Sequence, residues 1–307
     1  MTSSHRIRIG TRESALALYQ AREVQRALNN LNIQTEIIEI ISDGDVDLET
    51  PLYEMGIQGI FTKSLDIALL QNRIDIAVHS AKDVPTKLAK GLSLSAVLER
   101  GSPWDCLALP SGNSVIDLSE SCIIASSSLR RKSQWLYRHP NHAIESLRGN
   151  IQTRLNKLDH SGWHGAIFAQ AALERLNVSS HSFTTLEWML PAPAQGAIAV
   201  ASRQDDLQTV EACRSINHQA SGVCIASERD FLAALQGGCA VPIAAHAVIQ
   251  QDQLFFKGNI FSLDAKQKCE VEMQFNIDQA AEAGNLAAKE ILRKGGESII
   301  KTFRPSF

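Results

Sequence analysis

Short apolar runs alternate with amphipathic stretches along most of this chain, beginning at its amino terminus. A first apolar run is followed by a segment in which Leu16, Leu18, Val24 and Leu28 recur at approximately helical spacing. We expect strands at 6–10, 33–41 and 74–79, and helices at 11–28 and 61–71. This β-α-β-α-β order predicts a largely parallel sheet with right-handed crossovers.

The middle of the chain repeats the alternation and predicts a second α/β domain. Its expected strands are 107–109, 122–125, 143–147 and 166–169, and its expected helices are 128–138, 151–158 and 171–176. The segment P-A-P-A-Q-G at 191–196 is interpreted as a linker. A strand at 197–201 and a helix at 205–216 are expected after it.

The last third has a different pattern, which is typical of an α+β domain. A helix at 224–235 is broken by Gly237-Gly238, three strands follow at 243–249, 253–260 and 268–275, and a helix at 278–294 is expected to stop at Gly295-Gly296. A chain of 307 residues has room for two or three domains. We therefore divide it into domain 1 (1–98 and 197–216), domain 2 (99–196) and domain 3 (217–307).

Composition narrows the classes of function. The chain has 30 Lys and Arg against 33 Asp and Glu and a net charge of -3, so it lacks the overall basic field of a nucleic-acid binder. No apolar run approaches the roughly 20 residues of a membrane span, and the amino terminus lacks the apolar core of a signal peptide. We expect a cytoplasmic protein that binds neither nucleic acid nor membrane.

The six cysteines show no C-x-x-C pair and no metal-type spacing to histidine, so we expect neither a disulfide framework nor a metal site. Cys106, Cys122, Cys213 and Cys224 lie in apolar or helical contexts typical of core residues.

One polar pair follows the apolar strand at 74–79. Pro85 ends the strand, so Lys82 and Asp83 are expected in the loop past its carboxyl end, where open α/β sheets bind ligands. A carboxylate beside an ammonium is held ionised, because each charge favours the other. The alternative is a solvated pair on a surface loop.

Arginines recur where predicted strands pass into helices: Arg12, Arg130, Arg131, Arg148 and Arg154. Cations in a first helical turn are unfavourable unless an anion offsets them. Backbone N–H groups, a guanidinium and the hydroxyls of Ser14 or of 126–128 together form a cradle for an anion. We infer a small polyanionic ligand between two α/β domains, with carboxylate favoured over phosphate because no phosphate-binding glycine loop is present.

Cys239 differs from the other cysteines because it lies in L-Q-G-G-C-A-V-P, a tight loop between a predicted helix and a predicted strand. Two interpretations remain open: a partly buried structural cysteine, or the attachment point of a cofactor. A nucleophile would need a histidine base, and none stands out nearby.

The segment between Ser42 and Gly59 is acidic, contains several glycines and is long for a connection. We expect it to be a mobile lid.

Five segments together resemble the porphobilinogen deaminase (hydroxymethylbilane synthase) family. They are T-R-E-S-A-L-A-L-Y-Q at 11–20, H-S-A-K-D-V-P at 79–85, S-S-S-L-R-R at 126–131, S-L-R-G-N-I-Q-T-R-L at 146–155 and G-G-C-A-V-P at 237–242. Their order and spacing are those of the family, and the resemblance covers essentially the whole chain.

The resemblance implies a monomeric three-domain transferase whose first two domains are similar to lobes of periplasmic binding proteins. It implies the head-to-tail condensation of four porphobilinogen molecules, with release of ammonia, to linear hydroxymethylbilane in heme and tetrapyrrole biosynthesis. It further implies a dipyrromethane cofactor attached to Cys239 by a thioether, and Asp83 as the catalytic carboxylate.

By the same resemblance, the other site residues fall into two groups. Those expected at the cofactor, besides Cys239 and Asp83, are Lys82, Ser126, Ser128, Arg130, Arg131 and Gly149. Those expected at the substrate are Arg12, Ser14, Gln20, Phe61, Arg148, Arg154, Arg175, Gln195 and Gly196.

The chain departs from the family pattern in two segments. Gln58 replaces a basic residue in the glycine loop, and P-A-P-A-Q-G at 191–196 replaces the commoner P-A-V-G-Q-G, with Ala194 in place of a glycine. The second change is expected to stiffen the hinge around Gln195 and Gly196. Phe61 either stacks on a substrate ring or belongs to the core. His79 is assigned no chemistry.

The alternative from another class is a binding protein whose two α/β lobes capture a polyanion without chemistry. An exported binding protein needs a signal segment and has no use for a third domain with a glycine-flanked thiol. A ligand-sensing regulator would need a DNA-binding motif, and no helix-turn-helix candidate is found.

Overall fold

The computed structural model describes residues 6–41, 62–235 and 241–303, and these form two compact units. The first unit comprises Met1–Leu48, Ile57–Gly101 and Gly196–Gly222, and the second comprises Glu49–Gly56, Ser102–Gln195 and Val223–Phe307. Each unit is described separately below.

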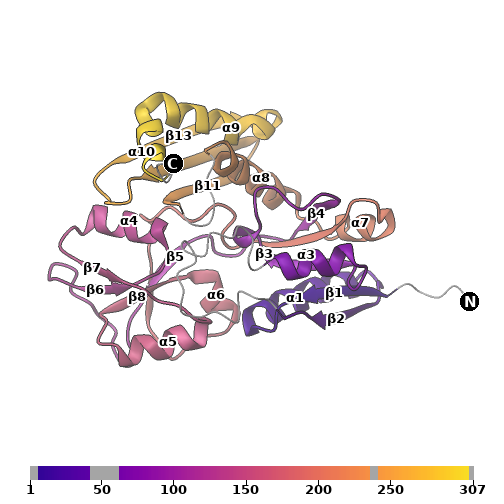
Figure 1. The fold of residues 1–307 in the computed structure, drawn as a ribbon, viewed down its shortest axis with the longest axis horizontal. Coiled ribbons are helices and arrows are strands. Elements are labelled where there is room, and N and C mark those ends of the chain that lie inside the picture. The colour runs from indigo at the N-terminus through magenta and orange to yellow at the C-terminus, as the bar shows by residue number, and fades with distance from the viewer. Residues whose placement is uncertain (1–5, 42–61, 236–240, 304–307) are drawn as a thin grey trace, which may run out of the picture. The chain divides into compact units, whose positions relative to one another are not determined.

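A five-stranded sheet with helices on both faces forms the first unit (Figure 1). In spatial order its strands are β2 (Thr35–Glu39), β1 (Ile7–Thr11), β3 (Ile76–Ser80), β10 (Ile198–Arg203) and β4 (Leu92–Val97). β1 is parallel to β2 and β3, as the β-α-β-α-β order predicts, whereas β10 is antiparallel to both β3 and β4. Strand β4 was not anticipated from the sequence.

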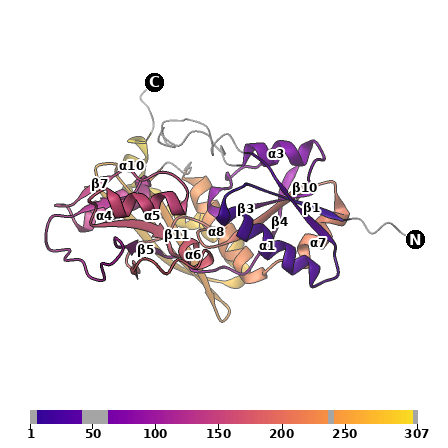
Figure 2. The same cartoon turned by 90° about the horizontal axis from the view of Figure 1, so that it is seen from below.

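The helices of the first unit are α1 (Ala15–Asn29), α3 (Lys63–Leu70) and α7 (Leu207–Arg214). Figure 2 shows α3 on one face of the sheet and α1 and α7 on the other. The core follows this division, since Val24 and Cys213 pack with Ile76, while Leu65 and Leu69 pack with Ala77. Of the apolar positions expected to face the core from α1, Val24 and Leu28 are fully buried, but Leu16 and Leu18 are only partly buried.

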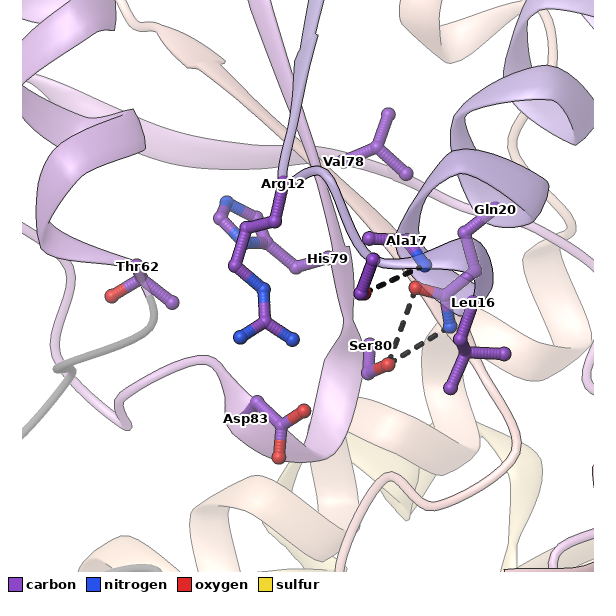
Figure 3. Close-up of a pocket in the computed structure, with 10 residues that line it drawn as sticks. Arg12, Leu16, Ala17, Gln20, Thr62, Val78, His79, Ser80 and Asp83 are labelled. Atoms are coloured by element: carbon purple, nitrogen blue, oxygen red, sulfur yellow. Dashed lines mark hydrogen bonds between the residues drawn. The ribbon is translucent and has the colours of Figure 1, made fainter. Parts of the chain in front are cut away.

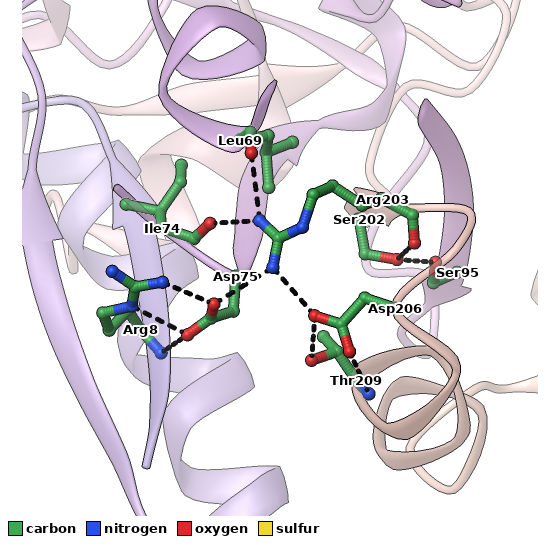
Figure 4. Close-up of polar contacts among 9 residues, drawn as sticks. All are labelled: Arg8, Leu69, Ile74, Asp75, Ser95, Ser202, Arg203, Asp206 and Thr209. Carbon is green, nitrogen blue, oxygen red and sulfur yellow. Dashed lines mark hydrogen bonds and ion pairs between the residues drawn. The ribbon is translucent and has the colours of Figure 1, made fainter. Parts of the chain in front are cut away.

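One buried carboxylate ties together three strands of this sheet (Figure 4). Asp75, directly before β3, accepts hydrogen bonds from Arg8 Nε and Nη2 at 3.0 and 2.8 Å and from Arg203 Nη2 at 3.2 Å. Arg203 also pairs with Asp206 at the start of α7. Burial by itself would raise the pKa of Asp75, but the hydrogen bonds from both arginines outweigh it and lower that pKa to about 2.

The second unit contains another five-stranded sheet. In spatial order its strands are β7 (Ala143–Glu145), β6 (Ile123–Ala125), β8 (Gly165–Ala169), β5 (Asp105–Ala108) and β9 (Phe183–Thr185). β6 is parallel to β7 and β8, and β5 is antiparallel to β8 and β9. Its helices are α4 (Leu129–Arg138), α5 (Ile151–His160) and α6 (Gln170–Arg175). The expected α/β sheet is confirmed, and β9 is the strand that was not anticipated.

A three-stranded antiparallel sheet, also in the second unit, confirms the expected α+β region. Its strands are β11 (Ile243–Gln250), β12 (Gln253–Phe261) and β13 (Lys268–Asn276), and its helices are α8 (Gln219–Ala234, which begins in the first unit), α9 (Ala280–Ile291) and α10 (Glu297–Lys301). The buried Glu228 of α8 joins this region to the 191–196 segment, because it accepts hydrogen bonds from the N–H groups of Ala194 and Ala247 at 2.6 and 2.7 Å.

The expected helix stop at Gly295-Gly296 is confirmed. Gly295 adopts φ 94°, a left-handed conformation that breaks the helical course after α9. A separate short helix, α10, follows this break, and its Ile299 and Ile300 are buried in the core of the small sheet.

Candidate active site

The carboxyl ends of two neighbouring parallel strands of the first unit border a small hollow that is open to solvent (Figure 3). Its lining consists of Arg12, Ser14, Leu16, Ala17, Gln20, Thr62, Val78, His79, Ser80 and Asp83. The sequence placed Arg12, Ser14, Gln20 and Asp83 in the ligand site, and the structure brings all four to this one hollow.

Asp83 and Arg12 reach the hollow from different strands. Asp83 ends the 3₁₀ turn Ala81–Asp83 after β3, Arg12 follows β1, and Figure 3 shows the guanidinium pointing toward the carboxylate. Among the described residues, no hydrogen bond or ion pair engages the Asp83 carboxylate. The Asp83 carboxyl group is therefore half-buried and available to a ligand.

Lys82 and Asp83 both lie in the 3₁₀ turn past the carboxyl end of β3, where the sequence predicts them. Both side chains are half-buried, and within the described part of the chain no ion pair joins them. Consecutive residues of a helical turn do not face each other, so adjacency along the chain does not bring the two charges together.

Ser14 and Gln20 are held in place by hydrogen bonds. Ser14 is the N-cap of α1, and its Oγ accepts from Ala17 N at 3.3 Å. Gln20 is buried, and its amide exchanges hydrogen bonds of 2.8 and 3.2 Å with the hydroxyl of Ser80. These contacts fix the rim of the hollow on the side of α1.

A second set of expected site residues lies at the edge of the larger sheet of the second unit, where β6 leads into α4 and β7 into α5. Ser126 is buried, and its Oγ accepts from Ser128 N at 3.3 Å. Ser128 caps α4 by accepting from Arg131 N at 3.4 Å. β6 and β7 are neighbouring parallel strands, so both strand-to-helix junctions lie at the same edge.

Arg130 and Arg131 are both buried against Asp105 of β5. Arg131 donates to Asp105 Oδ1 from Nε and Nη2 and to Ile167 O from Nη1, so all three guanidinium nitrogens are engaged within the protein. Arg130 Nη1 lies 2.7 Å from Asp105 Oδ2 and donates to Leu190 O at 2.8 Å. The anion that offsets the cations at this helix start is thus internal, and the sequence did not reveal it.

Arg148 is the clearest unused cation of this edge. Its side chain is buried, and its Nη1 has no hydrogen-bond partner in the described structure. Gly149 beside it has φ 111°, and a Cβ there would lie 2.7 Å from Thr153 Cγ2, so this turn requires glycine. The turn is closed by Arg154, whose Nε donates to Gly149 O at 2.7 Å.

The remaining expected residues, Gln195, Gly196 and Arg175, are not part of the lining of the hollow. Gln195 is fully buried and donates to Pro103 O at 2.8 Å and to Asp105 Oδ1 at 3.0 Å. Gly196 has φ 87°, and Arg175 is the half-buried last residue of α6. Gln195 therefore acts on the ion-pair cluster around Asp105 rather than presenting its amide to solvent.

Several expectations lie outside the described residues: Cys239, Phe61, Gln58 and the lid at 42–59. Cys106, Cys122, Cys213 and Cys224 are buried, as expected of core residues, and burial raises the pKa of the Cys106 and Cys213 thiols to about 12. No cluster of three or more metal-ligating side chains occurs within 6–41, 62–235 and 241–303. In the same ranges, every helix is too short or too polar to cross a membrane.

Two residues of these sites were missed by sequence reasoning. No sequence pattern marked Asp105 as a site residue, because it lies in an apolar strand far along the chain from the arginines that it pairs with. His79 was noticed but given no role, although its ring is buried in the wall of the hollow. Its position directly before Ser80 at a strand end was the available signal.

Two family sequence models match the chain. "Porphobilinogen deaminase, dipyromethane cofactor binding domain" matches residues 7–211, and "Porphobilinogen deaminase, C-terminal domain" matches residues 223–293.

The sequences of curated relatives align with this chain over nearly its full length. The porphobilinogen deaminase of Legionella pneumophila (strain Paris) is 38% identical over 301 residues, which cover 96% of this chain and 97% of the relative. That of Syntrophomonas wolfei subsp. wolfei is 39% identical over 298 residues, with the same coverage of each chain.

Among solved structures, two solute-binding proteins are similar at low sequence identity. The second substrate binding domain of a putative amino acid ABC transporter from Streptococcus pneumoniae has a TM-score of 0.44 and 9% identity, covering 68% of this chain and 90% of its own. An arginine transport periplasmic binding protein from Legionella pneumophila has a TM-score of 0.38 and 11% identity, covering 69% and 92%.

Proposed function

The chain belongs to the porphobilinogen deaminase family, and on that premise we propose how its own residues perform the family's reaction. The enzyme is a hydroxymethylbilane synthase, a transferase of tetrapyrrole biosynthesis. It joins four porphobilinogen molecules head to tail and releases ammonia from each. Membership of this family favours the enzyme over the binding protein that the sequence left as an alternative.

Asp83 is the catalytic carboxylate of this proposal. Loss of ammonia from the aminomethyl group of porphobilinogen leaves a cation delocalised over the pyrrole ring. A fixed carboxylate near the pyrrole N–H stabilises that charge as it develops and relays a proton. The observation that carries the proposal is the Asp83 carboxylate itself, which lies in the hollow, opposite Arg12, with no partner among the described residues.

Binding of the acid side chains is assigned to the arginines. Each pyrrole ring of substrate and cofactor carries an acetate and a propionate, so the site has to hold several carboxylates. Arg148 fits this need, because a buried guanidinium nitrogen without a partner is costly unless an anion is bound there. Arg12, Arg154 and Arg175 are proposed to share the task with it, together with Lys82, Ser14, Gln20 and Gly196.

Arg130 and Arg131 have different parts in this proposal. Every guanidinium nitrogen of Arg131 is hydrogen-bonded within the protein. Its positive charge is therefore proposed to attract the ligand without a direct hydrogen bond. Arg130 contacts Asp105 and Leu190 through Nη1, which leaves its other nitrogens for a ligand carboxylate. Ser126, Ser128, Gly149 and Gln195 shape the same edge.

The residues present suit a dipyrromethane cofactor, in line with the domain that matches residues 7–211. We propose that Cys239 holds it by a thioether. When bound, the cofactor supplies the pyrrole carbon to which the first substrate is joined. Phe61 is proposed to stack on a substrate ring.

The mass of the denatured chain tests the attachment. We expect an adduct of two pyrrole units on the purified protein, lost in Cys239→Ser and retained in Cys269→Ser, a matched variant of a buried cysteine. A bare mass for the wild-type chain that nevertheless converts porphobilinogen would contradict the thioether. Absence of hydroxymethylbilane from a chain that carries the adduct would contradict the activity.

Five further features belong to this proposal. The three-domain division at 98/99, 196/197 and 216/217 is supported by the three separate sheets. The net charge of -3 supports a protein that binds no nucleic acid. We also propose a monomer, located in the cytoplasm, with no membrane partner.

A further inference from the structure

His79 is a buried side chain with an unused polar atom. Its ring is only 6% exposed, and Nε2 has no hydrogen-bond partner in the described structure. Most buried polar atoms are paired, because leaving one unpaired forfeits its hydrogen bond to water. An orphaned nitrogen in the wall of a ligand hollow therefore points to a group that arrives with the ligand.

The surroundings of His79 define what that group is. The ring lines the same hollow as Arg12 and Asp83, and Figure 3 shows the imidazole beside the Arg12 side chain, on the same side of β3. The positive charge of Arg12 attracts anions and disfavours cations at this spot. An anion with two oxygens suits the pair, since one oxygen can face the guanidinium while the other faces the imidazole.

The ring is neutral at neutral pH. Burial, and secondarily the charge of Arg12, lower the pKa of His79 to about 4. A neutral imidazole carries one N–H and one lone pair. Beside a bound carboxylate, the tautomer with the proton on Nε2 is favoured, because it turns a donor toward the negative charge.

We propose that His79 Nε2–H donates a hydrogen bond to a ligand carboxylate that is held at the same time by the charge of Arg12. This rests on the proposed function, in which substrate and cofactor both bring acetate and propionate groups. The contact binds the ligand in its ground state and in the transition state alike. It therefore acts on affinity rather than on the chemical step.

Two variants of His79 distinguish the effect of hydrogen bonding from the effect of side-chain size. His79→Gln keeps an N–H donor of similar reach, and His79→Leu keeps an apolar side chain but has no donor. Each is purified as holoenzyme and compared with the wild type by thermal melting, by denatured mass for cofactor occupancy, and by KM and kcat with porphobilinogen.

The outcomes identify the source of the carboxylate. If it belongs to the substrate, His79→Leu keeps full occupancy and a near-normal kcat while KM rises about tenfold or more, and His79→Gln stays within about threefold of the wild type. If it belongs to the cofactor, His79→Leu loses the mass adduct and His79→Gln retains it.

A nitrogen NMR measurement tests the same contact without relying on activity. With ¹⁵N-histidine labelling, the His79 signal, assigned by its loss in His79→Gln, is expected to show a protonated Nε2 whose shift changes when cofactor or porphobilinogen binds. Unchanged KM and unchanged occupancy in His79→Leu, while the wild type makes product, overturn the inference. A wild type that makes no product instead overturns the proposed function.

Discussion

Asp105 and Arg131 are joined by two hydrogen bonds to a single carboxylate oxygen, Oδ1, at 3.0 Å from Nε and 2.8 Å from Nη2. Both side chains are buried, and Arg130 approaches the second oxygen of the same carboxylate. One carboxylate thus organises two guanidinium groups at the start of α4. Burial lowers the pKa of Arg130, and the negative charge of Asp105 opposes that shift.

Asp105→Asn is expected to destabilise the protein strongly. The variant keeps the shape of the side chain but leaves two buried guanidinium groups without their counter-ion, which costs about 3–5 kcal/mol of unfolding free energy. Urea unfolding at neutral pH measures the loss. Asp252→Asn, at an exposed position, is the control and should stay within about 0.5 kcal/mol of the wild type. Equal stability of the two variants would contradict the role of Asp105.

Asp83→Asn is expected to lower activity strongly and to leave stability nearly unchanged, in contrast to Asp105→Asn. The Asp83 carboxylate makes no hydrogen bond or ion pair within the described residues, so its loss should leave the melting temperature nearly unchanged. Turnover of porphobilinogen should fall by about 100-fold or more, since a carboxylate that stabilises charge and relays protons contributes at least that much. Asp252→Asn again serves as the control. A rate near that of the wild type would refute the assignment.

The ion pairs of Asp75 predict an acid-sensitive part of the stability. Because the pKa of Asp75 is lowered in the folded state from 3.8 to about 2, its contribution is fully present above pH 3.8 and is lost as the pH falls toward 2. That contribution is about 2 kcal/mol. The difference in unfolding free energy between wild type and Asp75→Asn should therefore be constant from pH 7 to 5 and shrink between pH 4 and 2. A difference that stays the same at pH 3 would show that packing, not charge, holds this junction.

Ala194→Gly is expected to stabilise the chain, although it removes a buried methyl group. Ala194 has φ 66°, a conformation that costs a residue with a Cβ about 1 kcal/mol and costs glycine almost nothing. We expect a gain of about 0.5 kcal/mol in unfolding free energy. Ala199→Gly in the extended strand β10 is the matched control and should lose stability. A loss in both variants would mean that the methyl group of Ala194 matters more than its backbone.

The order and type of most elements could be predicted from the sequence, because apolar periodicity is local. The strand near β3 and the helix after β1 each follow from residues within one window, and so does the position of Asp83 just past a strand end. The arginine-rich junctions were predicted for the same reason. The five family segments, together with these junctions, predicted the reaction.

Only the tertiary structure decided which distant groups meet. The antiparallel insertion of β10 between β3 and β4, the counter-ion Asp105 and the hydrogen bond between Gln20 and Ser80 all join residues far apart along the chain. Local patterns specify which face of an element is apolar, but they do not specify its partner across the sheet. The state of a buried charge or an orphaned nitrogen, such as His79 Nε2, depends on what folds beside it.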